Sequence, residues 1–538
     1  MKVLARCLLV VSLFLVIAPA LQPRDDYPRR PKLVLAIVID QFRFDYLVRF
    51  RSQFVARGFN LLLNGGANFV DCRYDYATTV TGPGHASLFT GAYPNIHGII
   101  GNSWFDRSLH REVGCVADPE TRLVGTGKTP ESRAGASPHN LIGSTIGDEL
   151  RAAQNFQSKV IAISLKDRSA ILPGGHTANA AYWFDGQTGR FITSSYYMKD
   201  LPSWAAHFND QVPGKEYCGK SWQALPESPG APGKVLREPL PTSEPCPSPH
   251  FFTAWLDGTP YISEIELNFA REAIKGERLG QGPSTDLLIV ALSVNDAIGH
   301  AFGPYSPEVA DTTLKTDRYL ADFFADLDKM VGLDNIWIAL SADHGVAPNP
   351  RYIHEHNLGM GIFNEAAVKT AVGQALSKTF GDDNWIDSVQ YAYIYLNLAT
   401  VEKHSLDRAK VEGVAAEGAQ TIPGINAAFT RSQFITGNLP QSALGHKAAN
   451  SFNAQRGGDI FLVIDPYAVP TTSETSTTHG TPWNYDAQVP LVLWGSAFRP
   501  GVYTSPCQPI DMVATLAVAL GLTQPSGSQG RALSEAVK

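Results

Sequence analysis

Apolar runs that end in polar residues recur along the chain and predict buried strands. Residues 32–39 read Lys-Leu-Val-Leu-Ala-Ile-Val-Ile and are followed directly by Asp40. Such nearly unbroken, β-branched runs are typical of strands buried on both faces of a parallel sheet. Further runs of this kind occupy residues 159–165, 286–292, 335–341, 459–464 and 489–494.

Segments with helical character lie between these runs, at residues 140–155, 260–275 and 307–333. Strands that alternate with helices predict an α/β fold, a doubly wound and mostly parallel sheet flanked by helices. Functional residues of such sheets gather beyond the carboxyl ends of the strands. One charged residue after a strand is commonly a cap, but here four strands end in charged residues. This repetition favours a functional edge.

Two stretches interrupt the alternation. Residues 195–255 are rich in Pro, Gly, Ser and Trp, which predicts a loop-rich insertion. Residues 355–455 carry a new alternation of helices and strands, which predicts a smaller inserted cap domain. We therefore expect a core made of residues 21–354 and 456–538, interrupted by the cap.

The first 20 residues have the features of a signal peptide. Lys2 and Arg6 supply positive charge, residues 7–17 are apolar, and residues 18–20 (Ala-Pro-Ala) offer a cleavage site. The apolar run is too short to span a membrane comfortably. We expect an exported protein, secreted or periplasmic, with no stable membrane association after signal cleavage.

Composition narrows the classes of partner. The chain has 538 residues, a formal net charge of −7 and no basic run, which disfavours capture of nucleic acid. Five cysteines remain after signal cleavage, and an oxidising compartment would pair some of them. Cys72–Cys115 and Cys218–Cys246 are the nearest pairings in sequence, although sequence leaves the connectivity open. Cys507 is the fifth.

A hydroxyl stands at a tight turn in residues 76–91. Thr81 precedes Gly-Pro-Gly and a helix-compatible run, and Pro83 suits the first turn of a helix. This places Thr81 at a helix N-terminus, where free N–H groups and the helix dipole favour an anion. A threonine at such a turn is commonly only an N-cap. The rest of the chain gives it a second interpretation.

Carboxylates and imidazoles collect at the predicted edge of the sheet. Asp296 and His300 have i,i+4 spacing, so one helical turn puts both on the same side. Each histidine alone would more commonly be a structural residue. Together they predict a two-metal site, with these ligands: Asp40, Asp296, His300, Asp343, His344 and His479. Mixed Asp/His ligation suits Zn²⁺ first, with Mn, Fe or Co possible.

The order of the ligands along the chain, together with Thr81-x-Pro83-x-His85, resembles the alkaline phosphatase superfamily. The Thr-x-Pro-x-His element resembles its branch of type I phosphodiesterases and nucleotide pyrophosphatases. Residues 101–104 (Gly-Asn-Ser-Trp) and 166–176 resemble the phosphate-irrepressible, PafA-like bacterial alkaline phosphatases. The similarity runs from about residue 33 to the final strand. These relatives are monoesterases with a threonine nucleophile.

The resemblance implies a role for each residue. One metal is assigned to Asp296, His300 and His479, and the other to a set with these members: Asp40, Asp343, His344 and the Thr81 oxygen. Coordination to a metal would lower the pKa of the threonine hydroxyl, which is otherwise a poor nucleophile. Thr81 would then form a covalent phosphothreonine.

Three further side chains are expected to bind the phosphoryl group. Lys166 and Arg168 leave the end of one strand together, and they match the extra charge of a monoester dianion. Arg can grip two phosphoryl oxygens at once. Asn102 would supply a neutral donor. A solvated charge cluster is the alternative for residues 166–168, but their position after a buried strand favours the functional interpretation.

The sequence therefore predicts an exported, metal-dependent alkaline phosphatase with two Zn²⁺ ions. It would act as a monomer on small phosphorylated metabolites. A phosphodiesterase or nucleotide pyrophosphatase on the same scaffold is one alternative, and a catalytically silent, metal-stabilised secreted binding protein is another. The intact ligand set and Thr81 argue against the silent protein. His85 stands where a sulfatase needs Arg, so sulfate monoesters should be poor substrates.

Overall fold

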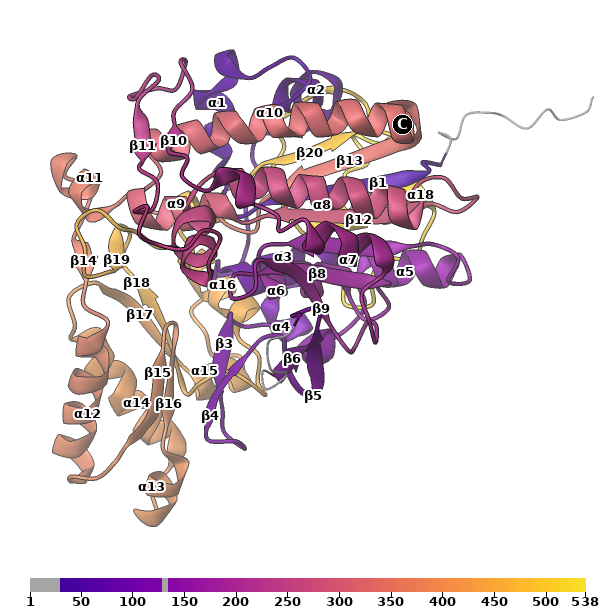
Figure 1. The fold of residues 1–538 in the computed structure, drawn as a ribbon. Helices are drawn as coiled ribbons and strands as arrows, with labels where there is room; N and C mark the ends of the chain where they lie inside the picture. The colour runs from indigo at the N-terminus through magenta and orange to yellow at the C-terminus, as the bar shows by residue number, and fades with distance from the viewer. Residues whose placement is uncertain (1–29, 128–133) are drawn as a thin grey trace, which may run out of the picture.

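A computed structural model describes residues 30–127 and 134–538 (Figure 1). The predicted signal peptide lies outside these residues. Over the described ranges, none of the helices has the length and apolar character needed to cross a membrane. The largest element of the fold is an eleven-stranded sheet, and it carries the site described below.

Five neighbouring parallel strands form the centre of this sheet, in the order β13-β1-β12-β7-β8. Their bounds are Leu33–Ile39 (β1), Val160–Ser164 (β7), Ala180–Asp185 (β8), Asp286–Leu292 (β12) and Ile336–Ser341 (β13). Every residue of these strands is buried, which explains their unbroken apolar runs. The predicted α/β, mostly parallel fold is confirmed.

Shorter strands extend the sheet at both sides. Beyond β13 lie β20 (Leu491–Trp494), β2 (Ala67–Phe69) and β21 (Gly501–Tyr503). Beyond β8 lie β9 (Arg190–Ser194), β5 (Ala117–Val124) and β6 (Ala134–Ala136). β20 runs antiparallel to both of its neighbours, so the sheet is mixed at this edge.

Helices flank the sheet on both sides. α8 (Tyr261–Glu277) and α10 (Pro307–Met330) pack together along it, whereas the helices of the other group are α3 (Thr81–Thr90), α5 (Ile146–Ala153), α6 (Asp167–Gly174) and α18 (Asp511–Leu520). The predicted helix at residues 140–155 is shorter than expected. It begins at Ile146 because Thr145 and Asp148 form a capping box there.

Residues 195–255 contain little regular structure. They include α7 (Ser203–Asp210) and a small hairpin of β10 (Trp222–Gln223) and β11 (Val235–Arg237). A disulfide joins Cys218 to Cys246, one of the two nearest pairings. The other pairing does not form, because the buried cysteines Cys72, Cys115 and Cys507 have free thiols.

A second, smaller sheet lies at the lower left of Figure 1, and its strand order is β15-β16-β18-β17. Its strands are β15 (Ile386–Gln390), β16 (Tyr393–Leu396), β17 (Ile425–Thr430) and β18 (Ile460–Ile464). Helices α12 (Ala366–Phe380) and α14 (Arg408–Gln420) pack with it. Our prediction that residues 459–464 extend the main sheet is therefore wrong.

The reason lies in how β18 is buried. Ile460, Leu462 and Ile464 pack into the core of the small unit, whereas Phe461 and Val463 pack into the main core. The strand is thus apolar on both faces without belonging to the parallel sheet. An unbroken apolar run reveals burial on both faces, but it does not say which sheet the strand joins.

Candidate active site

Four adjacent parallel strands deliver the predicted site residues to one edge. Asp40 follows β1, Lys166 follows β7, and Asp343 and His344 follow β13. After β12 the chain turns into α9 (Val294–Phe302), whose first turns carry Asp296 and His300. The carboxyl ends of parallel strands meet at one edge, so this sheet order brings distant residues together.

The carboxylates and imidazoles form a compact, mostly buried cluster. Nε2 of His344 lies 3.4 Å from Oδ1 of Asp40 and 3.3 Å from Oδ2 of Asp343. Oδ1 of Asp296 lies 3.2 Å from Nε2 of His300 and 3.5 Å from Nε2 of His479. The rings of His344 and His479 stack with their centroids 3.6 Å apart.

Backbone carbonyls fix the proton on each of these three histidines. Nδ1 of His300 lies 2.7 Å from the Thr477 carbonyl oxygen. Nδ1 of His344 and Nδ1 of His479 each lie 2.9 Å from a carbonyl oxygen, that of Gly345 and that of Thr79, respectively. A carbonyl only accepts, so Nδ1 donates and the neutral ring has a lone pair on Nε2. Burial lowers the pKa of His344 to about 3, which keeps that ring neutral.

This arrangement fits divalent cations. Three lone pairs face carboxylate oxygens. Among the described residues, no hydrogen-bond donor is found for the buried Asp40 Oδ1 or Asp343 Oδ2. In the part of the chain that the structure describes, ligand atoms within 4.8 Å of one another occur in two groups, Asp296/His300/His479 and Asp40/Asp296/His344. Anionic oxygens and imidazole nitrogens are zinc-type ligands, and Nδ1–H···O=C bonds orient such imidazoles. Asp296 belongs to both groups.

The Thr81 hydroxyl faces this cluster. Thr81 is the first residue of α3, it is buried, and its Oγ1 lies 3.5 Å from Nε2 of His344. Nδ1 of His85, one helical turn later, lies 3.0 Å from the Thr81 carbonyl oxygen and 3.2 Å from Oδ2 of Asp343. His85 thus ties the helix to the carboxylate, consistent with a structural role.

The glycines around Thr81 permit a close approach. A Cβ at Gly84 would lie 2.3 Å from the backbone oxygen of Asp343, so only glycine lets α3 pack against that loop. A Cβ at Gly82 would lie 3.2 Å from Oδ1 of Asn102. The Gly-Pro-Gly turn therefore reflects the close packing of α3 against the carboxylate loop.

Asn102 lies beside Thr81, and Lys166 lies beside the carboxylates. Oδ1 of Asn102 accepts from the Gly82 N–H at 2.7 Å, and its amide N–H groups have no acceptor among the described residues. Lys166 Nζ lies 2.6 Å from both Asp40 Oδ2 and Asp296 Oδ2, so its charge is shared with two of the proposed ligands. Arg168 has a buried Nε without a hydrogen-bond partner in the described chain.

Gln41 is a site residue that the sequence interpretation missed. Its amide Nε2 donates to Asp296 Oδ1 at 2.6 Å, and its backbone N–H donates to Asp343 Oδ1 at 3.0 Å. Gln41 therefore orients two carboxylates from different segments, Asp296 of α9 and Asp343 after β13. Its position directly after Asp40 was the only available signal, and a glutamine is an uncommon metal ligand.

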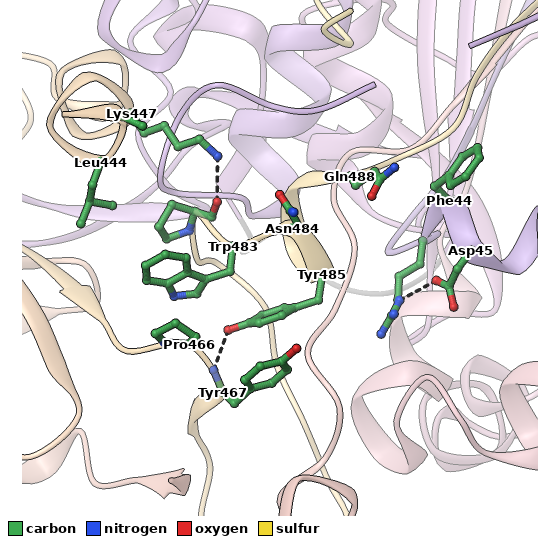
Figure 2. A pocket seen from close by; sticks show the side chains of 13 residues that line it. Phe44, Asp45, Leu444, Lys447, Pro466, Tyr467, Trp483, Asn484, Tyr485 and Gln488 are labelled. Carbon is green, nitrogen blue, oxygen red and sulfur yellow. Dashed lines mark hydrogen bonds and ion pairs between the residues drawn. The ribbon is translucent and has the colours of Figure 1, made fainter. Parts of the chain in front are cut away.

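The loop that carries His479 is anchored to the β13 loop. Oδ2 of Asp486 accepts from the N–H and hydroxyl of Thr481 at 2.9 and 2.6 Å, and its carbonyl accepts from the Gly345 N–H at 2.7 Å. Beyond this anchor lies a pocket of about 510 Å³ (Figure 2). There Tyr485 accepts from the Tyr467 N–H and Lys447 donates to the Pro482 carbonyl.

A parallel sheet that presents Asp and His around a buried threonine is typical of alkaline-phosphatase-like hydrolases. Residues 34–485 match the family model of type I phosphodiesterase / nucleotide pyrophosphatase, and the chain belongs to this family. The predicted family is confirmed.

Relatives cover nearly the whole chain. It is 35% identical to alkaline phosphatase PafA of Elizabethkingia meningoseptica, over 94% of this chain and 95% of the relative. It is 36% identical to alkaline phosphatase PhoV of Synechococcus elongatus, over 95% of this chain and 93% of the relative. The crystal structure of PafA superposes with a TM-score of 0.87 at 34% identity, covering 95% of this chain and 99% of PafA.

Proposed function

We propose that this protein is an exported phosphomonoesterase that works through a covalent phosphothreonine on Thr81. The observation that carries the proposal is the Thr81 hydroxyl, buried at a helix N-terminus and 3.5 Å from the His344 imidazole in the Asp/His cluster. The full-length relatives named alkaline phosphatase support the same reaction.

We assign one cation to Asp296, His300 and His479, and the other to Asp40, Asp343, His344 and Thr81. An oxygen of Asp296 also lies within 4.8 Å of ligand atoms of Asp40 and His344. Zn²⁺ is the proposed ion, because it favours this ligand set. When bound, such ions would lower the pKa of the nucleophile and stabilise charge on the departing oxygen.

The residues of the chain then have distinct tasks. The Thr81 oxygen bonds to phosphorus while the ester oxygen departs, and water later cleaves the phosphothreonine to release phosphate. The free amide N–H groups of Asn102 and the guanidinium of Arg168 would donate to phosphoryl oxygens. Lys166 would offset the negative charge of Asp40 and Asp296 and so lower the repulsion that a dianion meets.

Thr81→Ala tests the nucleophile, and Thr79→Ala is the matched control. The Thr79 hydroxyl donates to the Thr481 carbonyl at 2.7 Å and is therefore occupied. We expect Thr81→Ala to lower kcat for p-nitrophenyl phosphate by at least about 1000-fold, because covalent catalysis is lost. Thr79→Ala should retain most activity. Unchanged turnover by Thr81→Ala would rule out the proposed nucleophile and make Thr78 the next candidate.

Arg168→Ala separates the monoesterase from the diesterase that the family also contains. A monoester dianion carries one more negative charge than a diester, so it loses more when Arg168 is removed. We expect kcat/KM to fall about 100-fold for p-nitrophenyl phosphate and less than about 10-fold for bis-p-nitrophenyl phosphate. Equal losses for both substrates would favour the phosphodiesterase.

The remaining assignments also stay proposals. They are export through the N-terminal signal, action on small phosphorylated metabolites, a monomeric state, and division into a core and an inserted cap. β18 lies in the small sheet and β19 (Ala468–Pro470) pairs with β14 (Gly361–Phe363). We therefore propose that the cap ends near residue 470 and not at 455.

A further inference from the structure

A pocket of about 550 Å³ lies against the hairpin formed by β3 (Ser103–Asp106) and β4 (Arg111–Gly114). We call it the ribbon pocket. Its lining includes Trp104, Asp106 and Arg111 from the hairpin, and Asn140 and Arg456 from neighbouring segments. None of these residues has a task in the reaction described above.

The register of the hairpin connects this pocket to the phosphoryl site. Trp104 lies opposite Val113, and Asp106 lies opposite Arg111. Alternate residues of a strand share a face, so Trp104 projects to the side on which Asn102 lies. Asn102 still pairs with the ribbon, since its carbonyl accepts from the Cys115 N–H at 2.9 Å. The face that holds Asn102 beside Thr81 therefore continues outward into the ribbon pocket.

The buried thiol of Cys115 lies at the inner end of the ribbon, beside the residue that follows Thr81. Cys115 Sγ would lie 3.3 Å from a Cβ at Gly82, the residue after Thr81. Burial raises the pKa of Cys115 to about 12, while the positive charges of Arg168 and Arg456 both lower it. Arg456 therefore lies within electrostatic range of the same thiol as Arg168.

Two arginines of the pocket, Arg456 and Arg111, form no close ion pair within the described chain, although the Asp106 carboxylate lies within electrostatic range of both. Arg456 stacks 4.7 Å from the centre of the Trp104 ring, and its Nη1 donates to the carbonyls of Gly98 (2.6 Å) and Asn140 (2.7 Å). In residues 30–127 and 134–538, neither Arg456 nor Arg111 has a carboxylate at ion-pair distance. Nε and Nη2 of Arg456 thus remain free to donate, on a guanidinium held rigid by its stack.

We propose that the ribbon pocket binds the leaving group of the ester, and that Arg456 and Arg111 favour leaving groups that carry a second anionic group, a carboxylate or a phosphate. This inference rests on the proposed phosphomonoesterase. A substrate would place its phosphoryl group beside Thr81 and Asn102, and extend along the ribbon face toward the two arginines. The pocket adds specificity and takes no part in bond cleavage.

Two esters of equal size provide the test. The leaving groups of 4-carboxyphenyl phosphate and 4-carbamoylphenyl phosphate differ by one negative charge. The quantity to measure, in the full-length, zinc-loaded protein, is kcat/KM for the carboxyl ester divided by kcat/KM for the carbamoyl ester. Comparing this ratio between variants cancels the different reactivities of the two phenols.

Arg456→Met should lower this ratio about 10-fold or more, because a charge-assisted hydrogen bond in a partly buried site is lost. Arg111→Gln, on the exposed side of the ribbon, should lower it about two- to threefold. Arg57→Gln is the control, since this exposed arginine pairs with Asp328 away from the pocket and should leave the ratio unchanged. A ratio that stays constant in both pocket variants, or an equal loss for both esters, would overturn the proposal.

If Arg456→Met does not fold, the salt dependence of this ratio in the wild type and in Arg111→Gln tests the proposal instead. The wild-type ratio should fall between about 50 and about 500 mM salt, and Arg111→Gln should weaken that dependence. A ratio insensitive to salt in the wild type would contradict the subsite. If wild-type protein hydrolyses neither ester, the phosphomonoesterase itself fails. If it hydrolyses both with a constant ratio in every variant, only the subsite fails.

Discussion

At the scale of single residues, the site depends on the absence of a side chain as much as on its ligands. Gly84 lets α3 contact the backbone of Asp343, and a Cβ there would lie 2.3 Å from the Asp343 oxygen. Such an overlap with backbone cannot be relieved by a rotamer change. The nucleophile and one proposed metal ligand would have to separate.

We therefore expect Gly84→Ala to lower the free energy of unfolding by about 2–4 kcal/mol, and to reduce kcat/KM for p-nitrophenyl phosphate by more than about 10-fold. Gly373→Ala is a matched control in another helix, α12, where a Cβ would meet nothing within 4 Å. That change should stabilise by about 0.5–1 kcal/mol. Urea denaturation and steady-state kinetics would check both, and similar behaviour of the two variants would contradict the packing argument.

The site residues that the sequence revealed follow a local pattern, whereas those that it missed depend on contacts with distant segments. Asp40 and Asp343 were predictable because each ends an apolar run, and strand ends converge in a parallel sheet. Gln41 and Arg456 act through partners about 255 and 358 residues away, respectively, and no local pattern encodes such contacts. Their roles depend on the register of the folded chain.

At the scale of elements, local patterns predicted strands better than sheets. Alternate residues of β18 pack into two different cores, so its apolar sequence could not show which sheet the strand joins. Within the predicted cap, β15 and β16 are two separate antiparallel strands. By contrast, α8 and α10 lie close to their predicted bounds, since long helices are specified by their own spacing and caps.

A buried carboxylate joins two of these elements and predicts a pH effect. Asp317 of α10 accepts from the N–H groups of Val55 (2.7 Å) and Phe59 (2.6 Å), where α2 (Phe59–Gly65) begins. Burial raises the pKa of Asp317 to about 6, although both hydrogen bonds lower it. A carboxyl with a folded pKa above its unfolded value of about 3.9 stabilises most at low pH, and this contribution falls as pH rises toward 6.

Asp317→Asn removes this titration and leaves one N–H without an acceptor. We expect the variant to be less stable than wild type, and the difference to be larger at pH 4.5 than at pH 7.5 by about 2 kcal/mol. Urea denaturation of both proteins at the two pH values measures it. Loss of metal ions at low pH affects both proteins alike and cancels in the difference. A difference independent of pH would show that Asp317 does not titrate as described.

At the scale of the whole molecule, the proposed cations would link segments that lie far apart in the sequence. Asp40 and Asp343 follow strands β1 and β13, Asp296 lies in α9, and His479 lies in the loop between β19 and α17 (Asn484–Ala487). Without cations, carboxylates that repel one another and lone pairs on three imidazoles would face each other at close range. Metal binding should therefore stabilise the whole core, and should hold the His479 loop most of all.

We expect EDTA treatment to lower the Tm by several degrees and zinc to restore it, since saturation at 100 times Kd contributes about 2.7 kcal/mol per site. Amide hydrogen exchange should accelerate most in residues 294–302 and 471–481, because His300 and His479 lose their shared partner there. His479→Ala is the control: zinc should still stabilise it, through the Asp40, Asp343 and His344 set, but should no longer slow exchange in residues 471–481. If zinc protects that loop equally in the variant and the wild type, His479 does not anchor it, and the division of ligands between two cations must be redrawn.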